Sequence, residues 1–159
     1  MRFTGIALLI SLLVLLSCTK PPDYPDTPEI EFKSVNKSSF LQATNDSLLI
    51  SFTFTDGDGD IGLESNDRNI FFKDLRTNTS ELGFSVPEIP DQGVGNGISG
   101  EITCYLPMYL ICCLQPEFNL ACDQVLIERD TLVYEIFLED QAGNVSNTIR
   151  TDPIILICD

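Results

Sequence analysis

The sequence predicts an all-β domain in which about seven short strands form an antiparallel sandwich. Polar and apolar residues alternate over residues 47–55 and 131–140, which is the pattern of strands with one buried face. Weaker alternation recurs elsewhere, and Gly, Pro, Asn and Asp separate the alternating segments. No segment of ordinary helix length shows the helical repeat of about 3.6 residues. These three observations together define the fold class.

The predicted strands follow one another from residue 29. The first is expected over residues 29–33, where apolar residues alternate with charged ones. Residues 47–55 form the clearest strand, whose apolar face consists of Leu48, Ile50, Phe52 and Phe54. A third strand is expected over residues 69–75 and a short edge strand over residues 82–86.

The second half of the chain continues the pattern after a glycine-rich loop. Residues 98–106 alternate and place Cys104 on the buried face. Residues 131–140 form the second clear strand. The last strand is expected over residues 145–158 and contains Pro153, which lacks a backbone donor and indicates an edge position or a bulge.

Seven short strands with turns between them are typical of an immunoglobulin-like sandwich, and a small β-barrel is the alternative. The chain has no Trp, so the Cys…Trp…Cys signature of antibody domains is absent. Residues 105–114 and 121–128 allow no clear assignment. The domain is expected to occupy residues 29–159.

The N-terminal segment has the features of a secretory signal. Arg2 precedes an apolar run that is too short to span a bilayer. The run ends in Leu15-Leu16-Ser17-Cys18, which resembles the bacterial lipobox. The resemblance implies that residues 1–17 are removed and that Cys18 is acylated, with palmitate as a typical chain, whereas an ordinary signal peptide is the alternative. Residues 18–28 are proline-rich and predict an extended tether with a reach of about 30 Å.

Charge and composition exclude several classes of function. The formal net charge is −15 and no basic cluster occurs, which argues against nucleic acid and favours divalent cations. The chain has no His, so catalysis by His and His-ligated zinc or copper are excluded. No other catalytic constellation is apparent, and we expect the protein not to be an enzyme.

The cysteines indicate an oxidising compartment. Besides Cys18, the disulfide candidates are Cys104, Cys112, Cys113, Cys122 and Cys158. Loop lengths favour Cys112 or Cys113 with Cys122, and Cys104 with Cys158 as a second link. Five is an odd number, so internal pairing leaves at least one thiol over.

Three aspartates alternate with glycine directly after the clearest strand, at Asp56, Asp58 and Asp60. Carboxylates on a glycine-rich loop are suitable ligands for Ca²⁺, and a solvated turn is the alternative. The spacing resembles that of an EF-hand loop. However, Ile61 replaces the required glycine and Asp67 the bidentate glutamate, so we reject an EF-hand.

The predicted sandwich indicates which other residues lie near the acidic loop. In an immunoglobulin-like sandwich, the ends of strands 47–55 and 131–140 lie at one end of the molecule, next to the start of the first strand. We therefore expect Asp140 and Asn144 to join the acidic loop, at the end where the tether enters.

Two stretches, residues 52–62 and 134–146, resemble uncharacterised lipoproteins of one large group of Gram-negative bacteria. The turn over residues 140–144 also resembles a turn of bacterial immunoglobulin-like, cadherin-like and fibronectin-like domains. Asp46-Ser47-Leu48 and Asp130-Thr131-Leu132 are similar to the O-glycosylation motif of the same bacteria, which makes Ser47 and Thr131 candidate acceptors.

The resemblance implies a lipid-anchored protein of the cell envelope, in the outer membrane. For its domain we expect a non-catalytic binding or spacer role. Its partners would be the membrane, through the lipid, and an unidentified protein or glycan, but no nucleic acid. The alternatives are an accessory subunit or small hydrolase of a surface complex, and a purely structural envelope protein.

Overall fold

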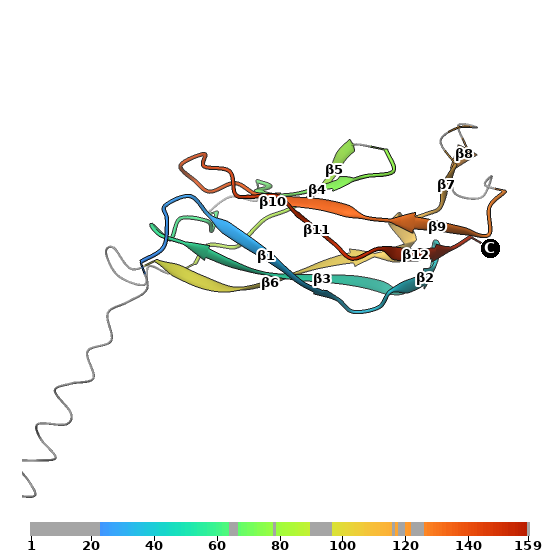
Figure 1. Cartoon of the computed structure of the whole chain (residues 1–159), viewed down its shortest axis with the longest axis horizontal. Coiled ribbons are helices and arrows are strands. Elements are labelled where there is room, and N and C mark those ends of the chain that lie inside the picture. The colour runs from blue at the N-terminus through green and yellow to red at the C-terminus, as the bar shows by residue number, and fades with distance from the viewer. Residues whose placement is uncertain are drawn as a thin grey trace, which may run out of the picture.

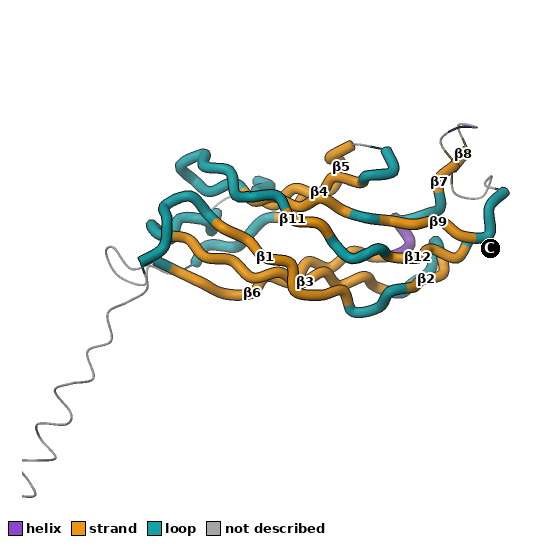
Figure 2. The backbone as a smooth tube through the Cα atoms, in the orientation of Figure 1, coloured by secondary structure: helices purple, strands orange, loops and turns teal. Residues whose placement is uncertain are grey.

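The computed structural model describes residues 23–63, 67–77, 79–89, 97–115, 117, 120–121 and 126–158. Two layers of β-structure face each other within these ranges (Figure 1, Figure 2). The strands in chain order are β1 (Glu29–Val35), β2 (Ser39–Leu41), β3 (Ser47–Asp56), β4 (Ile70–Asp74), β5 (Thr79–Phe84), β6 (Ile98–Pro107), β7 (Leu114–Gln115), β8 (Leu120–Ala121), β9 (Arg129–Leu132), β10 (Tyr134–Leu138), β11 (Ile149–Arg150) and β12 (Ile154–Ile157). One short 3-10 helix, η1 (Met108–Leu110), follows β6.

The first layer is an antiparallel sheet with the order β1-β3-β6. Its central strand β3 alternates strictly between buried and half-buried residues, as the sequence predicts. Phe52 of β3 lies between Phe32 of β1 and Ile102 of β6, so the apolar face continues across all three strands. The long ladder between β3 and β6 extends from Ser47 to Asp56 and places the acidic loop at one end of the layer.

The second layer is an antiparallel sheet with the order β11-β10-β4-β5. It continues into a further sheet with the order β2-β12-β9, because only Val133 separates β9 from β10. Pro153 lies in the interval between β11 and β12, which confirms the predicted interruption. Thr151 bridges this interval, since its backbone N–H donates to Tyr134 O at 3.0 Å and its Oγ1 accepts from Tyr134 N at 3.1 Å.

Apolar side chains from both layers form one core. Tyr134 and Phe72 of the second layer meet edge to face at 5.5 Å, and Phe84 meets Phe72 at 5.2 Å. The first layer supplies fully buried side chains, including Leu48, Ile50 and Phe52. Their burial removes apolar surface from water and is the main force that holds the layers together.

The all-β prediction is confirmed, but the predicted number and arrangement of strands differ from the structure. The described residues form twelve strands in four sheets rather than about seven strands in two. The sequence patterns do not reveal the short strands β2, β7 and β8, and interruptions divide the two C-terminal strands. β2 also pairs with β12 in parallel, whereas all pairs were expected to be antiparallel.

The predicted Cys104–Cys158 disulfide is wrong, and of the two alternatives for Cys122 only the pairing with Cys113 is excluded. Cys113 bonds to Cys158, and Cys104 is a free, buried thiol, so neither Cys104 with Cys158 nor Cys113 with Cys122 is correct. Cys104 lies in the middle of β6, opposite Ile50, whereas Cys113 and Cys158 meet at the end of the layers. Cys112 is also disulfide-bonded, and its predicted partner Cys122 lies outside the described residues.

The Cys113–Cys158 bond closes a loop with a sequence separation of 45 residues. A loop of this length constrains the unfolded chain, so we expect Cys113→Ala with Cys158→Ala to cost about 4 kcal/mol of unfolding free energy. Urea denaturation measures the loss. Cys104→Ala is the control because it removes a buried sulfur but no cross-link, and its cost should be about 1 kcal/mol. Equal losses in the two variants would contradict the stabilising role of the bond.

Candidate metal centre

Two loops meet at one end of the layers. The first follows β3 and carries Asp58 and Asp60, with Asp56 as the last residue of the strand. The second is the turn that follows β10 and begins at Asp140 (Figure 1). Backbone N–H groups of this turn hold the first loop, because Gln141 N donates to Asp60 O at 3.2 Å and Ala142 N to Asp60 Oδ2 at 3.1 Å. The sequence therefore predicts this convergence correctly.

Four carboxylates come together where the loops meet. Asp56, Asp58, Asp60 and Asp140 each present an oxygen, and these atoms all lie within 4.8 Å of one another. Asp56 is 0% exposed and Asp140 is 5% exposed, whereas Asp58 faces solvent. A cluster that is deep on one side and open on the other can receive an ion from water.

Two of the carboxylate oxygens are buried without a hydrogen-bond partner. Asp56 Oδ2 accepts from Asp60 N at 2.9 Å, but neither Asp56 Oδ1 nor Asp60 Oδ1 accepts a hydrogen bond from any described residue. A buried polar atom without a partner destabilises the fold by about 1–3 kcal/mol, and more when it is charged. A bound cation would satisfy both of these oxygens.

Burial and mutual repulsion change the acidity of the cluster. Burial first, and then the negative charge of Asp58, raise the pKa of Asp56 to about 6. Burial and then the charge of Asp140 raise the pKa of Asp60 to about 6. Both carboxyls are therefore ionised at neutral pH only at a cost in free energy.

Asn144 lies at the site and contacts Asp140. Its side-chain nitrogen donates to Asp140 Oδ2 at 2.8 Å and its backbone N–H to Asp140 Oδ1 at 2.7 Å. Asn144 therefore holds the Asp140 carboxylate in place, and its role as a metal ligand stays a prediction.

The acidic loop is anchored in the core. Ile61 is 0% exposed and belongs to the core, which explains why an apolar residue stands where an EF-hand has glycine. Gly59 has a φ of 78°, a conformation that glycine adopts without strain. The aspartates therefore lie on a loop that is held against the domain by the burial of Ile61 in the core.

Asn69 and Gln141 support the site, although sequence analysis does not identify them. Asn69 is buried, its Nδ2 donates to Ile61 O at 2.6 Å, and its Oδ1 accepts from Val86 N at 2.8 Å. Gln141 Nε2 donates to Gly62 O across the two loops. Polar residues next to a strand carry no periodic signal, so a single sequence gives no reason to select them.

The donor set defines the kind of ion that the site can hold. Four carboxylates supply only hard oxygen ligands, with no nitrogen or sulfur among them. Oxygen ligands suit Ca²⁺, Mg²⁺ and Mn²⁺, and Ca²⁺ accepts six to eight oxygens in flexible geometry. Carboxylates from two loops, with water on the open side, can meet this requirement.

The other predicted site residues lie elsewhere. Ser47 and Thr131 are in the first layer and in β9, at the end away from the acidic loop. Ser47 Oγ donates to Tyr105 Oη at 2.9 Å, and Thr131 is exposed. Cys18 lies outside the described residues.

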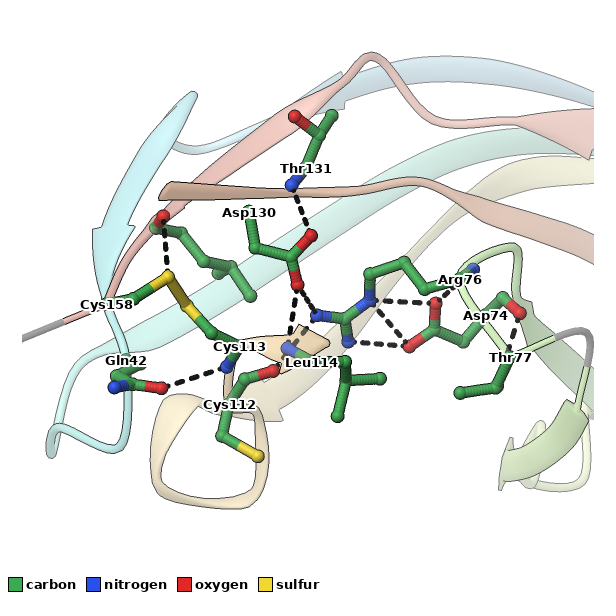
Figure 3. A network of polar contacts seen from close by, with 11 residues as sticks. Gln42, Asp74, Arg76, Thr77, Cys112, Cys113, Leu114, Asp130, Thr131 and Cys158 are labelled. Carbon is green, nitrogen blue, oxygen red and sulfur yellow. Dashed lines mark hydrogen bonds and ion pairs between the residues drawn. A yellow bond between two sulfur atoms is a disulfide. The ribbon is translucent and has the colours of Figure 1, made fainter. Parts of the chain in front are cut away.

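A half-buried ion-pair network holds the end that carries Thr131 (Figure 3). Arg76 forms ion pairs at 2.7 Å with both Asp74 and Asp130, and its Nη1 donates to Cys112 O at 2.9 Å. Asp130 Oδ2 also accepts from Leu114 N at 3.0 Å. The acidic residue of the second O-glycosylation motif therefore has a structural role, which sequence analysis misses.

Comparison with known proteins leaves the function to be argued from this geometry, since no protein family, curated protein or solved structure matches the chain. Across the described ranges, no helix is long and apolar enough to cross a bilayer.

The raised pKa of Asp56 gives the metal-free protein an unusual pH dependence. Its folded pKa, about 6, exceeds its ordinary value of 3.8, so its contribution to stability is complete below pH 3.8 and is lost as pH rises through 6. Relative to Asp56→Asn, the metal-free wild type should lose about 2 kcal/mol between pH 4 and pH 7. Urea denaturation of both proteins measures this difference. An unchanging difference would show that Asp56 is not destabilised when ionised.

Proposed function

We propose that this protein is a lipid-anchored module of the bacterial cell envelope whose β-domain is non-catalytic and is stabilised by Ca²⁺. The single observation that carries the metal assignment is the carboxylate of Asp56. It is 0% exposed, its Oδ1 has no hydrogen-bond partner within the part of the chain that the structure describes, and three other carboxylates lie beside it. A divalent cation would satisfy these oxygens and offset their repulsion.

We further propose that the domain is an immunoglobulin-like sandwich. The two main sheets contain three and four strands, with the orders β1-β3-β6 and β11-β10-β4-β5. β9 with β10, and β11 with β12, each follow one path interrupted by a short irregular stretch. Counted in this way, seven main strands remain, which supports the proposed class, and β2 is an additional short strand beside β12.

The position in the envelope rests on the resemblance of Leu15-Leu16-Ser17-Cys18 to a lipobox. Acyl chains on Cys18 would hold the protein on a membrane, which we propose to be the outer membrane, because several chains together make a firm anchor. The domain would then bind or space an envelope protein or glycan. The acidic cluster is better suited to holding an ion than to catalysis, because two loops enclose its deepest carboxylates.

Calcium should stabilise the fold. At about 100 times its Kd, a bound ligand adds about 2.7 kcal/mol, which for a domain of this size raises the melting midpoint by about 10 °C. Thermal melts with excess Ca²⁺ and after metal removal measure the shift. Equal midpoints would remove the calcium assignment.

A matched pair of variants separates specific binding from charge screening. Asp56→Asn and Asp152→Asn each remove one negative charge, but Asp152 is exposed on the interval between β11 and β12. The calcium shift should disappear in Asp56→Asn and persist in Asp152→Asn. Loss of the shift in both variants would mean that calcium acts through the overall charge of the protein.

Intact mass of the protein from its native host tests the envelope assignment. We expect the mass of residues 18–159 plus that of the lipid, and Cys18→Ala should move the protein from the membrane fraction to the soluble fraction. Hexose masses that disappear with Thr131→Ala or Ser47→Ala would identify glycosylation. A mass equal to that of the polypeptide alone would contradict both modifications.

A further inference from the structure

The segment that leads into the domain lies against the acidic loop. Gly57 N–H, one residue after Asp56, donates to Pro25 O at 2.8 Å. A Cβ atom on Gly57 would lie 2.4 Å from Tyr24 O, so only glycine permits this approach. A Cβ atom on Gly97 would lie 2.8 Å from Tyr24 Cδ2, which places the Tyr24 ring against that residue. Tyr24 and Pro25 are therefore docked on the backbone that carries Asp56.

The chain becomes firmly fixed only a few residues later. Pro28 is buried, and Asn147 clamps the first strand, because its Oδ1 accepts from Ile30 N and its Nδ2 donates to Ile30 O, both at 2.8 Å. Between Pro25 and Pro28 the side chains of Asp26 and Thr27 are exposed. The direction in which the chain leaves the domain thus depends on whether Tyr24 and Pro25 stay docked.

Charge couples this docking to the metal centre. The docked segment carries Asp23 and Asp26, and residues 23–29 include no basic residue. The segment lies against a loop whose Asp56, Asp58 and Asp60 are themselves crowded. The carboxylates of this loop repel one another, and a divalent cation among them would hold in place the backbone at Gly57, whose N–H binds Pro25 O. Ion binding and docking should therefore favour each other.

We propose that the cation controls the angle between the domain and its membrane tether, through the docking of Tyr24 and Pro25 on the acidic loop. With the ion bound, the loop is held and the tether leaves in one direction. Without it, repulsion opens the loop, Tyr24 leaves Gly97, and the domain swings about residues 25–28. This inference rests on the proposed calcium site. We call the ion-dependent docking of Tyr24 and Pro25 the tether lock, because it fixes the orientation of the domain relative to its tether.

The coupling can be measured on the full-length chain in detergent solution, labelled with 3-fluorotyrosine. The chain has 4 Tyr, so its fluorine NMR spectrum should show four resonances, and Tyr24→Phe identifies that of Tyr24. Adding Ca²⁺ to the metal-free protein should shift and broaden the Tyr24 resonance as the ring docks. The resonance of Tyr109, which is exposed on η1 at the other end, should not change.

Calorimetry provides a reciprocal test, since coupling between two events is mutual. Tyr24→Ala removes the docked ring and should weaken Ca²⁺ binding about fivefold, within the usual range of coupling. Tyr109→Ala is the matched control and should bind Ca²⁺ as the wild type does. Both variants keep the core, because neither residue belongs to it.

The outcomes separate the two proposals. Calcium binding with an unchanged Tyr24 resonance and an unchanged affinity in Tyr24→Ala would overturn the tether lock and leave the calcium site standing. No calcium binding by the wild type would overturn both. Binding together with a Tyr24 shift and a weakened Tyr24→Ala variant would support both.

Discussion

The fold depends on how four carboxylates are accommodated at one end of two packed layers. Asp56 is the last residue of β3, the central strand of the first layer, and is completely buried, with one oxygen that has no hydrogen-bond partner among the described residues. Such an arrangement is unfavourable by itself, because burial and like charges both oppose ionisation. The two loops and the incoming chain segment all contact this point. Whatever neutralises the cluster therefore determines how firmly three distant parts of the chain are joined.

The opposite end of the layers is held by internal chemistry. Arg76 neutralises Asp74 and Asp130, and the Cys113–Cys158 bond ties the stretch after η1 to the end of β12 (Figure 3). These contacts need no external ligand. The domain thus has one end that is cross-linked by its own side chains and one end whose crowded carboxylates we propose are neutralised by an ion from the surroundings. Residues 23–28 approach the second of these ends.

The neighbouring groups decide whether the charge of a buried or partly buried aspartate is balanced. Asp130 is partly buried beside a guanidinium and backbone N–H groups, so its charge is balanced. Burial first, and then neighbouring carboxylates, raise the pKa of Asp56 and that of Asp60 to about 6, and only backbone N–H groups oppose these shifts. The same residue type therefore has a balanced charge at one end of the molecule and an unbalanced charge at the other.

The sequence by itself determined the features that local patterns encode. Alternation identified β3 and β10, Pro153 marked the break before β12, and the spaced aspartates indicated the acidic loop. The directions of the two predicted strands were enough to predict that Asp140 lies next to that loop. Only the tertiary structure decided the Cys113–Cys158 pairing, the parallel β2–β12 contact, the Arg76 network and the contact of Asn144 with Asp140. These features join residues far apart in the chain or depend on side-chain orientation, so no periodicity or spacing in the sequence records them.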